Sequence, residues 1–196
     1  MGLTYVVTDA EFDGPNPGAN SMLAFASVAL VDGEIGESFE AVLSPLPEAS
    51  PDPGTMAWFK SEPDAYAFAT TNPQPAAVVM ADFVSYVRKL PGTPVFASHP
   101  LSLDGVWFDY YLHRFSGRSI IPGHREKDPL FPQPALCIAS FLSGRLGWDL
   151  SRCGYKNYPP EWLGNLPHSH RALDDAMGYA HLLKMLLERK ITLEAA

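Results

Sequence analysis

The sequence contains little cysteine, little positive charge and no long apolar run, and each shortage argues against a class of protein. The two cysteines, Cys137 and Cys153, do not have the spacing of a metal-binding or redox motif, so we expect buried or partly buried thiols. The absence of an apolar run of about 18 residues argues against a membrane span. The amino terminus lacks a basic region followed by an apolar one, so no signal peptide is expected. These features predict a soluble cytoplasmic protein with no membrane partner.

Basic residues are scarce, with 14 Lys and Arg against 22 Asp and Glu, and the net charge is −8. Nucleic-acid binding draws much of its affinity from basic side chains on phosphates, so this balance argues against a protein that grips long duplexes. The charge is uneven, because residues 1–90 hold three basic and twelve acidic groups whereas residues 114–171 hold eight basic and four acidic groups. The second region could supply a positive field, and the alternative is a solvated face of mixed charge.

The chain fits a single domain over residues 1–196, because no internal repeat or long low-complexity linker divides it. Strands are expected near residues 5–7, 22–31, 37–43, 94–98 and 135–137. Helices are expected at residues 55–60, 64–69, 75–90, 103–115, 138–146 and 171–189. Three strands followed by alternating helices and strands predict an α/β fold with a mixed sheet.

Two carboxylates, Asp9 and Glu11, lie at the end of the first strand and are separated by one residue. Side chains i and i+2 of a strand point to the same side, so the two carboxylates project together. Adjacent anions repel one another unless a cation lies between them, and hard cations such as Mg²⁺ prefer carboxylate oxygens. The alternative is an acidic pair beside an ordinary turn, since Asp13 to Gly18 has the composition of a loop.

Helical periodicity directs two more carboxylates toward the interior. Asp104 shares a face with the aromatic residues of its helix, whereas Asp109 points away from them. In the last helix, Asp175 lies on the apolar seam and Asp174 does not. His170 precedes this helix, so its side chain could reach into the site that Asp175 helps to line. For these carboxylates the alternative is a stabilising negative charge at a helix start.

The three acidic motifs resemble those of the DEDDh 3′-to-5′ exonucleases, a group within the ribonuclease-H-like superfamily. The matching residues are Asp9 and Glu11 in the first motif, Asp104 in the second, and His170 and Asp175 in the third. The motifs occur in the order of the family between about residue 5 and residue 185. The family often has Asn and Phe where this chain has Pro100 and Leu103. The segment Thr55 to Lys60 is also similar to one in phage and bacterial members, including a branch of exoribonucleases.

The resemblance implies a ribonuclease-H-like mixed five-stranded sheet flanked by helices, and a metal-dependent active site. Asp9, Glu11, Asp104 and Asp175 are expected to bind two Mg²⁺ or Mn²⁺ ions about 4 Å apart. His170 is expected to act as the general base that deprotonates the attacking water. The residues expected to contact the substrate are Phe12, Asp13, Gly14, Trp58 and His99. Trp58 is expected to do so by stacking on a base.

The expected reaction removes nucleoside 5′-monophosphates from the 3′ end of single-stranded nucleic acid, with RNA slightly favoured over DNA. An enzyme that acts on a few terminal nucleotides needs less basic surface than a protein that grips a long duplex, which fits the acidic charge. One alternative is a 3′-to-5′ deoxyribonuclease of proofreading or phage type. Another is a non-catalytic nucleic-acid-binding or protein-binding module on the same fold. Apolar surface near the carboxyl-terminal helix is also compatible with a homodimer.

Overall fold

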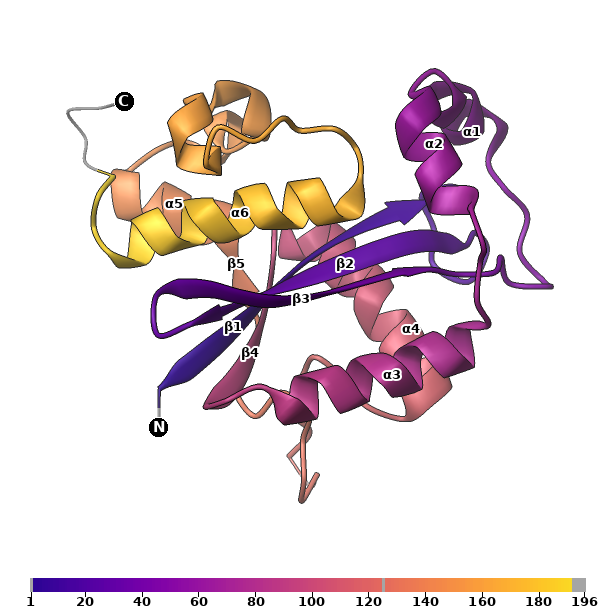
Figure 1. Ribbon diagram of the computed structural model, residues 1–196, viewed down its shortest axis with the longest axis horizontal. Helices are drawn as coiled ribbons and strands as arrows, with labels where there is room; N and C mark the ends of the chain where they lie inside the picture. Colours follow the sequence, from indigo (N-terminus) through magenta and orange to yellow (C-terminus); the bar gives the residue numbers. More distant parts are fainter. Residues whose placement is uncertain (1, 125, 192–196) are drawn as a thin grey trace.

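The computed structural model describes residues 2–124 and 126–191 and contains one five-stranded sheet (Figure 1). Its strands are β1 (Leu3–Phe12), β2 (Met22–Val31), β3 (Glu34–Val42), β4 (Thr93–Ser98) and β5 (Leu136–Cys137). They lie in the order β3-β2-β1-β4-β5. β2 is antiparallel to β1 and β3, whereas β4 is parallel to β1 and β5. The mixed five-stranded sheet expected from the sequence is therefore confirmed.

The acidic pair lies near the end of the first strand, as the sequence predicted. Asp9 pairs with Ala26 and Glu11 with Ala24 of β2, so both residues belong to β1. The backbone remains extended because the long apolar run of β2 offers hydrogen-bonding partners along this whole length. The Asp32-Gly33 turn predicted between β2 and β3 is present, and both of its residues have positive φ, as a tight hairpin turn requires.

In the part of the chain that the structure describes, six α-helices flank the sheet, within a few residues of their predicted positions. They are α1 (Pro53–Lys60), α2 (Pro63–Thr70), α3 (Ala76–Lys89), α4 (Val106–Ser116), α5 (Ile138–Leu146) and α6 (Ala172–Leu187). Figure 1 shows α5 and α6 on one face of the sheet, α3 and α4 on the other, and α1 and α2 beyond the end of β1. Over residues 2–124 and 126–191, none of the helices has the length and apolarity needed to cross a membrane.

Alternating side chains of the central strands fill two cores, one on each face of the sheet. Val7 and Val28 pack in the core that includes α5 and α6. On the opposite face, Phe25 lies edge-on to Phe108 of α4 with ring centroids 5.0 Å apart, and Phe83 of α3 lies 4.8 Å from Phe108. These packed faces fix α4 and α6 against β1, and so position the ends of both helices beside the acidic strand.

The helix predicted to begin at Leu103 begins differently. Leu101–Gly105 forms a short π turn, and α4 begins only at Val106. A side chain at position 105 would crowd Leu101, because a Cβ atom on Gly105 would lie 2.5 Å from the Leu101 Cδ1 atom. The wider π turn is a local irregularity of a kind often found at functional sites. Here it holds Asp104 in a buried position.

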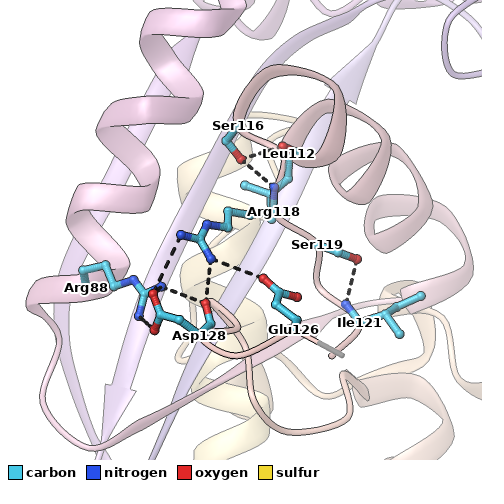
Figure 2. Close-up of polar contacts among 8 residues, drawn as sticks. All are labelled: Arg88, Leu112, Ser116, Arg118, Ser119, Ile121, Glu126 and Asp128. Carbon is cyan, nitrogen blue, oxygen red and sulfur yellow. Dashed lines mark hydrogen bonds and ion pairs between the residues drawn. The ribbon is translucent and has the colours of Figure 1, made fainter. Parts of the chain in front are cut away.

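The irregular segment after α4 is tied to α3 by the polar contacts drawn in Figure 2. Arg88 donates to the two carboxylate oxygens of Asp128 at 2.8 and 2.7 Å. Arg118 donates to the backbone carbonyl of Asp128 at 2.6 Å and to Glu126 at 3.3 Å. Because these side chains are partly exposed, the ion pairs contribute little to stability, and their main effect is to hold the loop against α3.

Candidate active site

The predicted metal-binding carboxylates come together at the end of the sheet where β1 ends. Asp9 and Glu11 come from β1, Asp104 from the π turn after β4, and Asp175 from the first turn of α6. All four line one open cavity of about 390 Å³. The other predicted site residues that line it are Phe12, Gly14, Trp58, His99 and His170. Residues from four separate segments of the chain thus converge on one cavity.

Three of the carboxylates are close enough to share a cation. Single carboxylate oxygens of Asp9, Glu11 and Asp175 all lie within 4.8 Å of one another. Asp104 lines the same cavity, and its charge acts on both Asp9 and Glu11. Asp9, Asp104 and Asp175 are buried, with no more than 8% of each residue exposed. A buried group of like charges is costly unless a cation or protons neutralise it.

The pKa values of the carboxyl groups express this cost. Burial raises the pKa of Asp9 well above its usual value, and the charges of Asp104, Glu11 and Asp175 raise it further. Burial also raises the pKa of Glu11, followed by the charges of Asp175 and Asp104. The pKa of Asp104 is raised by burial, against the opposing effect of backbone hydrogen bonds. An all-oxygen, anionic donor set of this kind fits a hard divalent cation such as Mg²⁺ or Mn²⁺.

His170 lies where a general base could face the carboxylates. It directly precedes the N-cap of α6 and has a left-handed backbone with φ of 56°. Its ring lies edge-on to the indole of Trp58, with ring centroids 5.0 Å apart. Burial and the neighbouring His168 lower the pKa of His170. A lowered pKa keeps the imidazole neutral near pH 7 and able to accept a proton.

His168, which was not among the predicted site residues, contacts Asp175 directly. Nδ1 of His168 lies 3.0 Å from Oδ1 of Asp175, and the backbone N–H of Ser169 donates to the same oxygen at 3.1 Å. The ring of Tyr155 stacks on the imidazole of His168, with centroids 3.6 Å apart. The available signal in the sequence was a second histidine two residues before His170. Its partner Tyr155 comes from a loop whose path the sequence does not predict.

In each of the pairs Asp174/Asp175 and Asp104/Asp109, one carboxylate faces the cavity and the other does not, as the helical spacing predicted. Asp175 faces the cavity, while Asp174 accepts a hydrogen bond from the Ser169 hydroxyl at 2.7 Å. Asp104 faces the cavity, while Asp109 accepts hydrogen bonds from the Ser119 hydroxyl and the Ile120 backbone N–H. Each inward carboxylate therefore has a neighbour of the same type that serves a local structural contact.

The residues predicted to contact the substrate differ in how they are placed. Trp58, on α1, is 47% exposed at the cavity. Phe12 is also at the cavity, and its ring stacks on Trp107 at 4.4 Å. Asp13 does not line the cavity with its side chain, because its carboxylate accepts the backbone N–H of Ser21 at 2.5 Å. Its position is set by the turn after β1, which the strand pattern could not predict.

The ring of His99 lines the cavity, but its Nε2 atom is already hydrogen-bonded within the protein. Its Nε2 atom lies 2.7 Å from the hydroxyl of Tyr158. Its ring stacks on Tyr179 of α6, with centroids 4.4 Å apart and planes 8° apart. Burial lowers the pKa of His99 to about 4. The ring therefore connects β4, α6 and the loop that carries Tyr158 as a neutral, packed group beneath the carboxylates.

Comparison with known proteins gives one relative by sequence. No family model matches the chain. A curated Escherichia coli protein, the 3'-5' DNA exonuclease Cap18, is 29% identical over 186 residues, which covers 93% of this chain and 90% of the relative. The similarity extends over nearly the whole of both chains.

Solved structures share the fold at low sequence identity. A 3′-exonuclease studied for its recognition of the histone mRNA stem-loop has a TM-score of 0.66 at 14% identity, covering 95% of this chain and 81% of its own. The nuclease domain of 3'hExo, a DEDDh family member bound to rAMP, has a TM-score of 0.65 at 13% identity, covering 95% and 92%. Escherichia coli Exonuclease I in complex with a dT13 oligonucleotide has a TM-score of 0.64 at 16% identity, covering 96% and 42%. The resemblance to DEDDh exonucleases and the ribonuclease-H-like fold are thereby confirmed.

Proposed function

We propose that this chain, a relative of the DEDDh 3′-to-5′ exonucleases, is a divalent-metal-dependent exonuclease that releases nucleoside 5′-monophosphates from single-stranded 3′ ends. The observation that carries the proposal is the convergence of four carboxylates and His170 on one open cavity. The Escherichia coli relative, named a 3'-5' DNA exonuclease, supports the same activity. A non-catalytic binding module has no need of the raised pKa values and repulsion that this cluster carries.

The four carboxylates are the proposed ligands of two Mg²⁺ or Mn²⁺ ions. Asp9, Glu11 and Asp175 offer oxygens close enough to share one ion, and Asp104 adds a further carboxylate across the cavity. When bound, the ions supply activation of the attacking water and stabilisation of negative charge on the leaving oxygen. The buried carboxylates hold their positions through the packed β1 strand and α6 helix, so the donor set is formed before the substrate arrives.

His170 is the proposed general base. Its imidazole, neutral because its pKa is lowered, accepts a proton as the water oxygen forms a bond to the terminal phosphorus. The bond between this phosphorus and the 3′ oxygen of the preceding nucleotide breaks, and that oxygen leaves as a hydroxyl after it gains a proton from solvent. The products are a nucleoside 5′-monophosphate and a strand shortened by one nucleotide.

Aromatic side chains at the cavity are the proposed contacts for the terminal bases. Trp58 presents an exposed indole that can stack on a base of any sequence. Phe12 presents a ring fixed by its stack on Trp107, and the chain at Gly14 borders the same cavity. A cavity of about 390 Å³ is large enough for a nucleotide at a strand end, where unpaired bases are free to stack on these rings. We therefore propose a single-stranded 3′ end as the substrate.

We propose that DNA is the preferred substrate. This replaces the slight preference for RNA that was expected from the sequence. The reason is the Escherichia coli relative, which carries the name of a DNA exonuclease and resembles this chain over 93% of its length. RNA is the second candidate, because two of the solved structures are described with histone mRNA and with rAMP. A contact with the 2′-hydroxyl would decide between the two sugars.

The homodimer and the cytoplasmic location remain predictions. Leu187, near the end of α6, and Leu3 of β1 are partly exposed and line a shallow, largely apolar cavity together with Phe141. We propose this surface as the contact of such a dimer. Light scattering of the wild type and of Leu187→Glu would test it, with a change from dimer to monomer as the expected result.

Degradation of matched DNA and RNA strands tests the proposed activity and its sugar preference. Each strand carries a 5′ label and either a free or a blocked 3′ end, and Mg²⁺ or Mn²⁺ is present. We expect stepwise shortening from free ends only, with nucleoside 5′-monophosphates as products and DNA degraded faster than RNA. Faster degradation of RNA would contradict the sugar assignment, and intact strands in every condition would contradict the activity.

A further inference from the structure

A second group of potential metal ligands lies beside the carboxylate cluster. One ring nitrogen each of His168 and His170 and one carboxylate oxygen of Asp175 all lie within 4.8 Å of one another. The group contains two imidazoles and one carboxylate, whereas the neighbouring group of Asp9, Glu11 and Asp175 contains carboxylates alone. Asp175 belongs to both groups. The cavity therefore presents two donor sets of different chemistry that share one residue.

We propose that His168, His170 and Asp175 form a transition-metal site that binds Zn²⁺ in preference to Mg²⁺. Imidazole nitrogens suit Zn²⁺ and its neighbours in the first transition series, whereas carboxylates and water suit Mg²⁺. Two histidines, one carboxylate and an open fourth position make up a common zinc site. The cavity side of the group is open, so that water can complete the coordination.

The geometry of the group needs little change to accept an ion. A tetrahedral ion about 2.0 to 2.1 Å from each ligand atom has ligand atoms roughly 3.3 Å apart. Nδ1 of His168 and Oδ1 of Asp175 already lie 3.0 Å apart. The rings of His168 and His170 have centroids 4.7 Å apart and planes 77° apart, so their nitrogens approach from different directions. Rotation of the His170 side chain is the main adjustment that the ion requires.

Tyr155 and Ser169 hold the proposed ligands His168 and Asp175 in place. The ring of Tyr155 stacks on His168 at a centroid distance of 3.6 Å and fixes the plane of the imidazole. The backbone N–H of Ser169 donates to Oδ1 of Asp175, the oxygen that faces His168. Partners that orient metal ligands in this way are a regular part of metal sites. Asp175 itself is only 4% exposed, so its position is set by the packing of α6.

Zinc at this site would inhibit the exonuclease, a consequence that rests on the proposed function. The bound ion takes one ring nitrogen of His170, which leaves the other nitrogen as an N–H that cannot accept a proton from water, and it takes one oxygen of Asp175. Mg²⁺ at the carboxylates does not displace it readily, because the two ions prefer different ligands. We therefore expect Zn²⁺ to inhibit strand degradation even when Mg²⁺ is saturating.

Metal binding tests the site without any reference to activity. Calorimetric titration of Zn²⁺ in saturating Mg²⁺ measures the affinity, and the visible absorption of Co²⁺ reports nitrogen ligands in a tetrahedral site. We compare the wild type with His168→Ala, with Asp9→Asn, which alters only the carboxylate group, and with His113→Ala, an exposed histidine of α4 outside the cavity. Wild type and His113→Ala should bind one Zn²⁺ with similar affinity, and Asp9→Asn should still bind one Zn²⁺. His168→Ala should lose affinity by about 10-fold to 100-fold or more.

Circular dichroism and thermal unfolding establish that each variant is folded, and His168→Asn provides a second, smaller change at the same position. Equal Zn²⁺ affinity in the wild type and in folded His168→Ala or His168→Asn would overturn the site. Loss of Zn²⁺ binding in Asp9→Asn but not in His168→Ala would overturn it too, by placing zinc at the carboxylates. Zn²⁺ binding that depends on His168 in a protein without nuclease activity would retain the site and contradict only the proposed function.

Discussion

Nδ1 of His168 lies 3.0 Å from Oδ1 of Asp175, and this contact joins a loop residue to the buried carboxylate of α6. The same oxygen accepts the backbone N–H of Ser169, so one side of Asp175 is held by the segment that leads into the helix. Asp175 is at the same time part of the three-carboxylate group with Asp9 and Glu11. The residue therefore connects the loop before α6 to the proposed metal site on β1.

Divalent metal should stabilise the folded protein. Bound Mg²⁺ or Mn²⁺ removes the repulsion among buried carboxylates, and an ion at 100 times its dissociation constant contributes about 2.7 kcal/mol to the free energy of unfolding. Thermal unfolding with and without metal should show this as a higher unfolding temperature. Asp9→Asn should reduce the shift, whereas Asp174→Asn, whose carboxylate contacts Ser169, should keep it. An equal shift in Asp9→Asn and the wild type would contradict the assignment of Asp9 as a ligand.

Replacement of the proposed general base should slow catalysis without loss of the fold. His170→Ala should lower kcat by about 100-fold to 10,000-fold, the usual contribution of a positioned general base. KM should change less, because His170 acts on the water and not on the bases of the strand. Steady-state kinetics on a single strand measures both constants, with His113→Ala on α4 as the control. A kcat for His170→Ala within twofold of the wild-type value would refute its role.

Loss of the exposed indole at the cavity should weaken substrate binding. Trp58→Ala should reduce single-strand affinity by about 1 to 3 kcal/mol, the value of one stacked base. The unfolding temperature should change little, because Trp58 is 47% exposed. Fluorescence anisotropy with a labelled strand measures the affinity, and Leu150→Ala, at an exposed residue outside the cavity, is the matched control. The stacking role fails if the Trp58 and Leu150 variants bind equally well.

Acid should destabilise the protein partly through His99. Burial lowers the pKa of His99 from 6.5 to about 4. Between these two pH values the unfolded chain therefore binds a proton at His99, whereas the folded chain does not. The contribution of this group to stability is complete above pH 6.5 and is lost as the pH falls toward 4, about 3 kcal/mol in all. His99→Phe keeps an aromatic ring against Tyr179 but cannot titrate.

Urea unfolding at pH 7 and pH 4.5 tests this prediction, because the difference between wild type and His99→Phe cancels the contributions of the other acidic and basic groups. The wild type should lose more stability than the variant between the two pH values. An equal loss in both proteins would mean that His99 does not titrate in this range.

The periodicity of the sequence was sufficient for most of the fold. The alternation and apolar content of β1 and β2 predicted adjacent central strands, and helical spacing predicted that Asp104 and Asp175 would face inward while Asp109 and Asp174 would not. These features are local, since each depends on which face of one strand or helix is apolar. The resemblance to DEDDh exonucleases added the expectation that the carboxylates of the three motifs come together in one site.

Features that depend on contacts between distant segments could not be predicted. The π turn at Leu101–Gly105 arises where β4 leads into α4, and no periodic pattern marks it. The contact of His168 with Asp175 depends on Tyr155, which lies in a loop of short 3₁₀ turns. The hydrogen bond from the Ser21 backbone N–H to the Asp13 carboxylate depends on how the turn between β1 and β2 closes. Each is set by tertiary packing and not by local propensity.

We propose that the buried carboxylates support metal-dependent hydrolysis at a 3′ end. The most direct measurement compares Asp104→Asn with Asp109→Asn, since both residues lie in one helical segment but only Asp104 lines the cavity. A 5′-labelled single strand with a free 3′ end is incubated with Mg²⁺ and each protein. We expect a shortening ladder for the wild type and for Asp109→Asn, and a rate for Asp104→Asn lower by about 10-fold to 100-fold or more. Equal rates for the two variants, or a strand left intact by the wild type, would contradict this proposal.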